Sequence, residues 1–94
     1  MTENFRWELR AMYKILIVDD EKIERNGIRM LLNSLGYSFE IAEANNGQTA
    51  YDLMSGNEFD IVLTDIKMPF MNGIELIKKC RDNGSEQKFI IFSG

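Results

Sequence analysis

Carboxylates stand directly after apolar segments in this chain of 94 residues. Asp19 and Asp20 follow the apolar residues 15–18, and Asp65 follows a second apolar segment that ends at Thr64. Clustered carboxylates repel one another unless one holds a proton or a cation neutralises the group. The sequence contains no histidine, so oxygen ligands of this kind favour Mg²⁺ or a similar hard ion. A carboxylate held beside such an ion can accept a phosphoryl group as an acyl phosphate.

The elements that position these carboxylates alternate between strand and helix. Four short, mostly apolar runs predict strands at residues 14–18, 39–43, 59–64 and 88–92. Apolar residues at helical spacing predict helices between them, over residues 23–35, 49–54 and 74–80. This alternation is typical of a parallel sheet that helices cover on both faces.

The carboxyl ends of parallel strands meet at one edge of the sheet, where open sheets of this type bind ligands. We therefore expect Asp19, Asp20 and Asp65 to converge there, with the hydroxyl of Ser93 following the fourth strand. An aspartate after a strand can also simply cap the next helix, and for Asp19 or Asp20 alone this explanation is equally good. The whole set favours a functional pocket, whereas Glu21 is expected to be a solvated charge in the first helical turn.

Composition excludes several classes of function. The net charge of −4 argues against non-specific nucleic-acid binding, which needs a basic face. The absence of histidine excludes a Ser-His-Asp or Cys-His hydrolase on this chain alone. The single cysteine, Cys80, allows no internal disulfide and is expected to be a small core residue. No secretory signal or apolar run of membrane-spanning length is present, so the cytoplasm is the expected location.

The first eleven residues differ from the rest. We interpret residues 1–11 as an N-terminal extension or tag-like segment, because Met12 precedes the first apolar run as a natural start. Residues 12–94 are expected to form a single domain.

Three segments carry a resemblance to a known family: ILIVDDE (residues 15–21), IVLTDIKMPFMNGIEL (61–76) and IIFSG (90–94). They resemble, in register from Met12 to Gly94, the receiver domain of two-component response regulators. The resemblance implies a flavodoxin-like α/β fold of three layers with strand order 2-1-3-4, incomplete because it has four of the family's five strands. It also implies signal transduction: Asp65 would take a phosphoryl group from a sensor histidine kinase and relay it as a conformational switch.

The resemblance assigns a role to each site residue. Asp65 would be the phospho-acceptor, Asp20 a direct Mg²⁺ ligand, and Asp19 its partner, often acting through water. The backbone carbonyl of Lys67 would be a third ligand, and Ser93 would be the switch hydroxyl that moves toward the phosphoryl group. In the connecting loop, Pro69 is expected to add stiffness and Gly73 to allow a close backbone approach.

The 94 residues include no counterpart of the family's fourth helix, fifth strand and fifth helix, nor of the lysine that ends the fifth strand. Without this lysine we expect Mg²⁺ to bind but phosphorylation and switching to be weak. The fourth strand would be an exposed edge and the first helix would lack a neighbour, which predicts self-association or domain swapping. Residues 5–9, with their Phe, Trp and Leu, could cover part of this surface.

Two other functions compete with this one. A phosphatase with an aspartyl-phosphate intermediate, like the haloacid dehalogenases, needs a second aspartate two residues after its nucleophile. Lys67 stands there after Asp65, and Glu21 after Asp19. The remaining alternative is an interaction or assembly fragment of a receiver fold with an impaired pocket. A transcriptional output, loosely of the AraC type, is expected outside this chain, which itself offers no surface for reading DNA.

Overall fold

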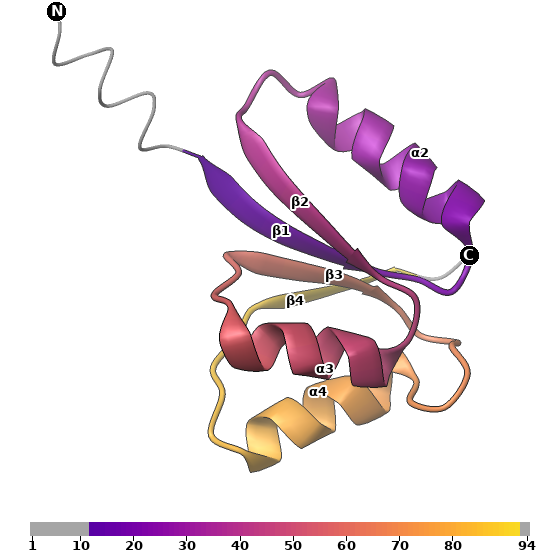
Figure 1. Cartoon of the computed structure of the whole chain (residues 1–94), viewed down its shortest axis with the longest axis vertical. Coiled ribbons are helices and arrows are strands. Elements are labelled where there is room, and N and C mark those ends of the chain that lie inside the picture. The colour runs from indigo at the N-terminus through magenta and orange to yellow at the C-terminus, as the bar shows by residue number, and fades with distance from the viewer. Residues whose placement is uncertain (1–11, 93–94) are drawn as a thin grey trace, which may run out of the picture.

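A computed structural model of the chain describes residues 12–92, in which four strands alternate with three helices (Figure 1). The strands are β1 (Tyr13–Val18), β2 (Phe39–Ala44), β3 (Ile61–Asp65) and β4 (Phe89–Phe92). The helices are α2 (Lys22–Asn33), α3 (Gly47–Gly56) and α4 (Gly73–Asp82). The predicted order of elements is thus confirmed. The predicted extension, residues 1–11, lies outside the described residues, as does Ser93.

The four strands form one parallel sheet in the order β2-β1-β3-β4. In its register Val18 of β1 pairs with Thr64 of β3, and Asp65 pairs with Phe92 of β4. The sheet order confirms the flavodoxin-like architecture. Because β1 lies between β2 and β3, the carboxyl ends of β1 and β3 are neighbours at the point where the chain changes direction across the sheet.

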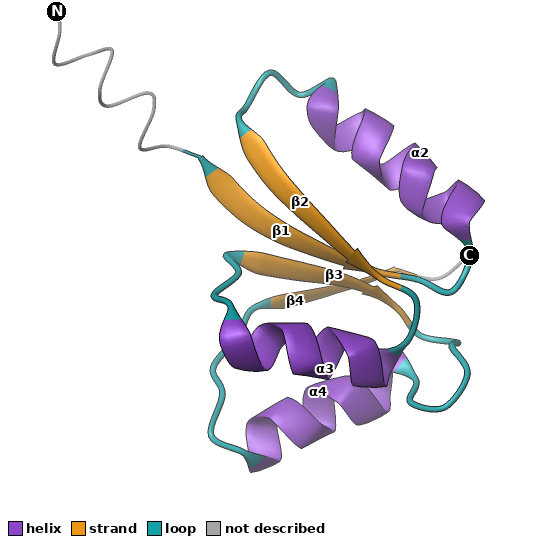
Figure 2. Cartoon of the chain, in the orientation of Figure 1, coloured by secondary structure: helices purple, strands orange, loops and turns teal. Residues whose placement is uncertain are grey.

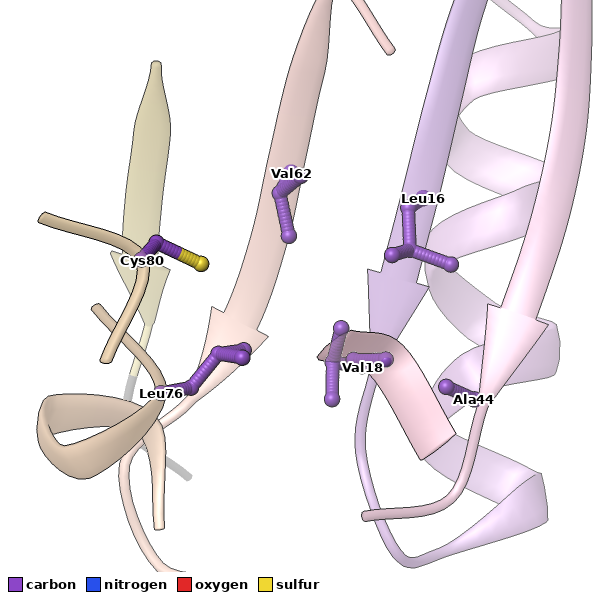
Figure 3. Packing of buried hydrophobic residues seen from close by; sticks show 7 residues of the cluster. Leu16, Val18, Ala44, Val62, Leu76 and Cys80 are labelled. Atoms are coloured by element: carbon purple, nitrogen blue, oxygen red, sulfur yellow. The ribbon is translucent and has the colours of Figure 1, made fainter. Parts of the chain in front are cut away.

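Helices cover the two faces of the sheet unequally (Figures 1 and 2). The face toward α3 and α4 holds the main core, where Leu16, Val18 and Val62 from the strands meet Leu76 and Cys80 from α4 (Figure 3). Cys80 is 2% exposed, which confirms it as a core residue, and burial raises the pKa of its thiol. A buried thiol of this kind is chemically inert.

Helix α2 is the single described helix on the opposite face. The predicted helix over residues 23–35 ends earlier, at Asn33, and none of its residues is fully buried. Its apolar residues Ile23 and Leu31 are exposed, as expected for a helix without a neighbour on this face. An apolar hollow remains between α2 and the end of β4, lined by Glu24, Gly27, Ile28, Leu31 and Phe92.

Side-chain caps fix where α3 and α4 begin. The Asn46 side chain accepts a hydrogen bond from the Thr49 N–H at 2.8 Å. Asn72 accepts from the Glu75 N–H at 2.8 Å, and the Glu75 carboxylate accepts from the Asn72 N–H at 2.9 Å, which completes a capping box. The capping box therefore fixes Asn72 as the residue at which the loop ends and α4 begins. Within residues 12–92, none of the helices combines the length and the apolar character needed to cross a membrane.

Candidate functional site: an acidic cluster at the ends of β1 and β3

The structure brings two of the predicted carboxylates together. Asp19 follows β1 directly and is 0% exposed, and Asp65 is the last residue of β3 and is 8% exposed. Each offers a carboxylate oxygen to a group of three, whose oxygens all lie within 4.8 Å of one another, and the third member is Glu24. We call Asp19, Glu24 and Asp65 the acidic cluster. It lies at the predicted edge of the sheet.

The two oxygens of the Asp19 carboxylate have different surroundings. Oδ1 accepts a hydrogen bond from the Glu21 N–H at 2.9 Å. Oδ2 is buried and has no hydrogen-bond partner among the described residues. A buried carboxylate oxygen without a donor is costly. The side chain therefore needs a proton or a cation on its Oδ2 side.

Asp65 is held by the backbone of the residues that follow it. The Ile66 N–H donates to Asp65 Oδ1 at 2.7 Å, and the Thr64 hydroxyl donates to the Asp65 carbonyl at 2.9 Å. The Gly73 N–H donates to the Ile66 carbonyl at 2.9 Å, which ties the start of α4 to the end of β3. The hydrogen bond to Oδ1 thus fixes the orientation of the Asp65 carboxylate.

Glu24 is the member of the acidic cluster that sequence reasoning missed. It lies in the first turn of α2 and is partly buried. The nearby carboxylate of Asp19 raises the pKa of Glu24 to about 7, because a protonated Glu24 can donate a hydrogen bond to Asp19 and the negative charge of Asp19 disfavours the ionised form; burial and the charges of Glu21 and Asp65 contribute less. The available signal was an acidic residue one helical turn after the strand-end aspartates.

Ion pairs between α2 and β2 hold the helix that carries Glu24 against the sheet. Arg25 Nε donates to Glu43 Oε1 at 2.7 Å, and Arg25 Nη1 donates to the Asp19 carbonyl at 2.7 Å. Arg29 Nη2 lies 2.7 Å from Glu43 Oε2. The two guanidinium groups lower the pKa of Glu43 below its usual value, chiefly through these hydrogen bonds. The first turn of α2 is therefore fixed against the ends of β1 and β2.

The other predicted site residues lie beside the cluster or beyond the described chain. Asp20 is exposed and shares an open hollow with Lys67, Met68 and Pro69. The alternative explanation for Asp19 and Asp20 was that one of them caps the next helix. The N-cap position of α2 is instead occupied by Glu21, whose side chain makes no cap hydrogen bond. Glu21 is exposed, as expected of a solvated charge. The metal-ligand roles of Asp20 and the Lys67 carbonyl, and the switch role of Ser93, stay predictions.

The loop between Asp65 and α4 is tightly turned. The Met71 N–H donates to the Pro69 carbonyl at 2.8 Å, and Phe70 between them has a φ of 69° and a 91% exposed surface. Met68 and Met71 pack against the main core. Gly73 approaches the Asp65 backbone so closely that a Cβ would overlap the Asp65 carbonyl oxygen. The loop thus holds the Asp65 end of β3 against the start of α4.

The donor set of the cluster suits a hard divalent cation. It consists of carboxylate oxygens, which Mg²⁺ and Ca²⁺ prefer. The buried Oδ2 of Asp19 lacks a donor, and the guanidinium of Arg25 is engaged with Glu43 and a backbone carbonyl. A cation would therefore satisfy an oxygen that the described side chains leave without a partner.

Comparison with known proteins identifies the family. Residues 15–94 match the response regulator receiver domain. The chain is 45% identical over 85 residues to an uncharacterised transcriptional regulatory protein, YesN of Bacillus subtilis, and the match covers 88% of this chain and 23% of that protein. The chain thus spans about a quarter of the length of this relative.

Solved structures of receiver proteins share the fold. The response regulator TrrA of Thermotoga maritima, crystallised with Mg²⁺ and beryllium fluoride, superposes with a TM-score of 0.79 at 33% identity, covering 87% of this chain and 70% of that one. A two-component transcriptional regulator named AraC, from Clostridium phytofermentans, superposes with a TM-score of 0.76 at 36% identity, covering 87% of this chain and 67% of that one.

The chain belongs to the receiver domain family of two-component response regulators. Domains of this family are signalling modules that carry phosphotransfer chemistry and are not turnover enzymes. Their acidic clusters usually bind Mg²⁺, and they interact with sensor histidine kinases.

Proposed function

We propose that this chain accepts a phosphoryl group on Asp65 from the phosphohistidine of a sensor kinase, with Mg²⁺ bound by the acidic residues at the same edge of the sheet. The observation that carries the proposal is the meeting of Asp19 and Asp65, 46 positions apart in sequence, with the Asp19 Oδ2 buried and unpartnered. The TrrA structure that holds Mg²⁺ and beryllium fluoride supports it by likeness.

The chemistry follows from how Asp65 is held. Its Oδ1 accepts the Ile66 N–H, so Oδ2 is the oxygen that attacks phosphorus. The P–N bond to the donor imidazole breaks, the electron pair goes to that nitrogen, and an aspartyl phosphate forms. Bound Mg²⁺ would offset negative charge on the phosphoryl oxygens. Asp19, Asp20 and the Lys67 carbonyl are the proposed ligands beside Asp65, and the Ser93 hydroxyl would donate to the product.

The proposed organisation follows the family match, with a receiver domain over residues 12–94 and an extension over residues 1–11. The likeness to YesN, a transcriptional regulatory protein, supports a transcriptional output carried elsewhere in the protein. The cytoplasm is the proposed location. The conformational signal would pass through the loop after Asp65. Phosphorylation would then shift an equilibrium between two surface arrangements.

A phosphoryl mimic tests the proposal directly. Amide NMR spectra of the full chain should shift saturably around Asp65 and Ile66 when Mg²⁺ is added, and shift again when beryllofluoride follows. Mg²⁺ alone should leave the last turn of α3 unchanged, because α3 starts near the carboxyl ends of the strands and its last turn lies at the far end of the helix. Spectra that do not change with either addition would contradict the proposal.

A second candidate function, assembly through an impaired receiver fold, is favoured by the edge of the sheet. Strand β4 is the last strand of the described sheet, and Ile90 and Ile91 on it are 51% and 40% exposed. Apolar residues on an exposed edge promote pairing with a second chain. Self-association would then occur through β4 or through α2, whose Leu31 is 63% exposed.

Sedimentation velocity separates the two functions. If β4 drives association, Ile90→Glu should shift the chain to a monomer at concentrations where the wild type is dimeric. Ile74→Glu is the matched control, because Ile74 is an isoleucine of nearly the same exposure, 52%, that lies on a helix, α4, and not on the strand edge. A wild-type chain that sediments as a monomer at about 100 μM, a concentration at which weak interfaces associate, would count against the assembly function.

A further inference from the structure

The third carboxylate of the cluster comes from a helix and not from a strand end. Glu24 lies in the first turn of α2, and one of its oxygens lies within 4.8 Å of oxygens from both Asp19 and Asp65. The family resemblance assigns no role to this position. Acidic residues on helices are usually solvated, so the position of Glu24 needs a separate explanation.

The backbone beside Glu24 is held in place by strong contacts. Its neighbour Arg25 is 14% exposed along its side chain and bonds both Glu43 and the Asp19 carbonyl at 2.7 Å. Charge-assisted hydrogen bonds of this length are among the stronger contacts in proteins. The rotation of α2 is thereby fixed, and Glu24 is kept on the side of the helix that meets the cluster.

Among residues 12–92, Glu24 forms no salt bridge. The hollow on its other side is lined by Gly27, Ile28, Leu31 and Phe92, none of which carries a charge. The guanidinium of the adjacent residue, Arg25, already bonds Glu43 and a carbonyl. Three carboxylates therefore face one another, and one of them has a buried oxygen without a donor, Asp19 Oδ2. A proton on Glu24 or a cation between the carboxylates would satisfy that atom, and a cation would also offset the repulsion among all three groups.

We propose that Glu24 is a third carboxylate ligand of the divalent cation, in addition to the aspartates that the family resemblance assigns. The inference rests on the proposed function, since it concerns the same cation. An extra anionic oxygen ligand raises the affinity of a hard-ion site, because affinity follows the number and charge of its oxygen ligands. This chain should bind Mg²⁺ or Mn²⁺ more tightly than the same site with a neutral residue at position 24.

Calorimetric titration of Mg²⁺ and Mn²⁺ into the full chain tests the inference. Glu24→Gln should raise the dissociation constant at least about tenfold, because loss of a residue that only orients a metal ligand already costs about 10–100-fold in affinity. Glu21→Gln is the matched control. It removes an exposed charge from the start of the same helix and should change the constant by less than about twofold, as a screened surface charge does.

A further variant separates direct ligation from a general charge effect. Glu24→Asp keeps the charge but withdraws the carboxylate by one methylene, so it should also weaken binding, to nearly the extent of Glu24→Gln. Thermal melting without cation checks the fold: Glu24→Gln should melt no lower than the wild type, because it removes repulsion from Asp19.

The outcomes distinguish the inference from the proposed function. If the wild type binds cation and Glu24→Gln binds equally well, the inference is overturned and the proposed function stands. If Glu24→Asp binds as tightly as the wild type, Glu24 acts through charge alone and is not a ligand. If the wild type binds no divalent cation, or if Asp19→Asn leaves binding unchanged, the proposed function falls and the inference with it.

Discussion

Replacing Asp65 with asparagine is expected to reduce phosphoryl incorporation to at most about 1% of the wild-type level, because an amide oxygen cannot form the acyl phosphate. The geometry of the site should survive. Asparagine retains an oxygen that can accept the Ile66 N–H, and the Thr64 hydroxyl bonds the backbone carbonyl and not the side chain. Incorporation is measured with a radiolabelled small phosphodonor and Mg²⁺, followed by hydroxylamine cleavage of the acyl phosphate. Rates are compared with those of the wild-type chain under the same conditions.

Two matched variants show which role Asp65 plays. Asp19→Asn should also lower incorporation, but excess Mg²⁺ should restore part of it, since a lost ligand weakens binding whereas a lost nucleophile removes the reacting atom. Asp52→Asn changes an exposed aspartate on α3 and should leave the rate unaltered. Incorporation by Asp65→Asn at the wild-type rate would show that another residue carries the phosphoryl group.

The fold was predictable to the extent that it depends on local patterns. Residues 15–18 are apolar throughout because β1 is covered on both faces, and this pattern distinguishes a buried parallel strand from an alternating one. The strand order β2-β1-β3-β4 could not be predicted from local patterns. No local pattern specifies which strands become neighbours, and the order came from the resemblance to receiver domains.

Asp19 and Asp65 were predictable because their positions depend on strand ends alone. Once β1 and β3 are neighbours, the residues that end them must meet. Glu24 depends on the rotation of α2 about its axis, which is set by contacts between Arg25 and residues of β1 and β2. Such contacts join segments far apart in the sequence, so the spacing of residues within α2 does not reveal them.

The expectation that α2 and β4 expose apolar residues came from the resemblance to receiver domains and not from the local patterns. Apolar residues at helical spacing indicate a face that can be buried, but they do not say how much of it is covered. Leu31 and Ile90 fit their predicted elements and yet are 63% and 51% exposed. The residual apolar surface is therefore a property of the whole arrangement, and the sedimentation experiment on Ile90 addresses it.

Substituting Gly73 with alanine is expected to be the most destabilising glycine-to-alanine change within residues 12–92. A Cβ at this position would overlap the Asp65 carbonyl oxygen and would lie 3.2 Å from the Asp65 carbonyl carbon and 3.3 Å from the Ile66 Cα. All three obstacles are backbone atoms, so no side-chain rotation relieves the overlap. We expect a loss of about 3 kcal/mol in the free energy of unfolding, the upper range for overpacking.

Gly73→Ala is expected to displace the site residues as well as to lower the free energy of unfolding. The Gly73 N–H bonds the Ile66 carbonyl, and the Asn72 capping box fixes the first turn of α4. Relief of the overlap must therefore move either the start of α4 or the end of β3 that carries Asp65. Phosphoryl incorporation should fall even at temperatures where the variant remains folded.

Gly27→Ala supplies the control for the same chemical change. Gly27 lies inside α2 and a Cβ there would have no atom within 4 Å, so alanine should stabilise the helix by up to about 1 kcal/mol. In a domain of this size, about 3 kcal/mol corresponds to a drop of roughly 12–24 °C in Tm. Thermal melts of the two variants should thus move in opposite directions from the wild type. Equal melting temperatures would mean that β3 and α4 can separate at little cost, and that the close approach at Gly73 does not hold Asp65 in place.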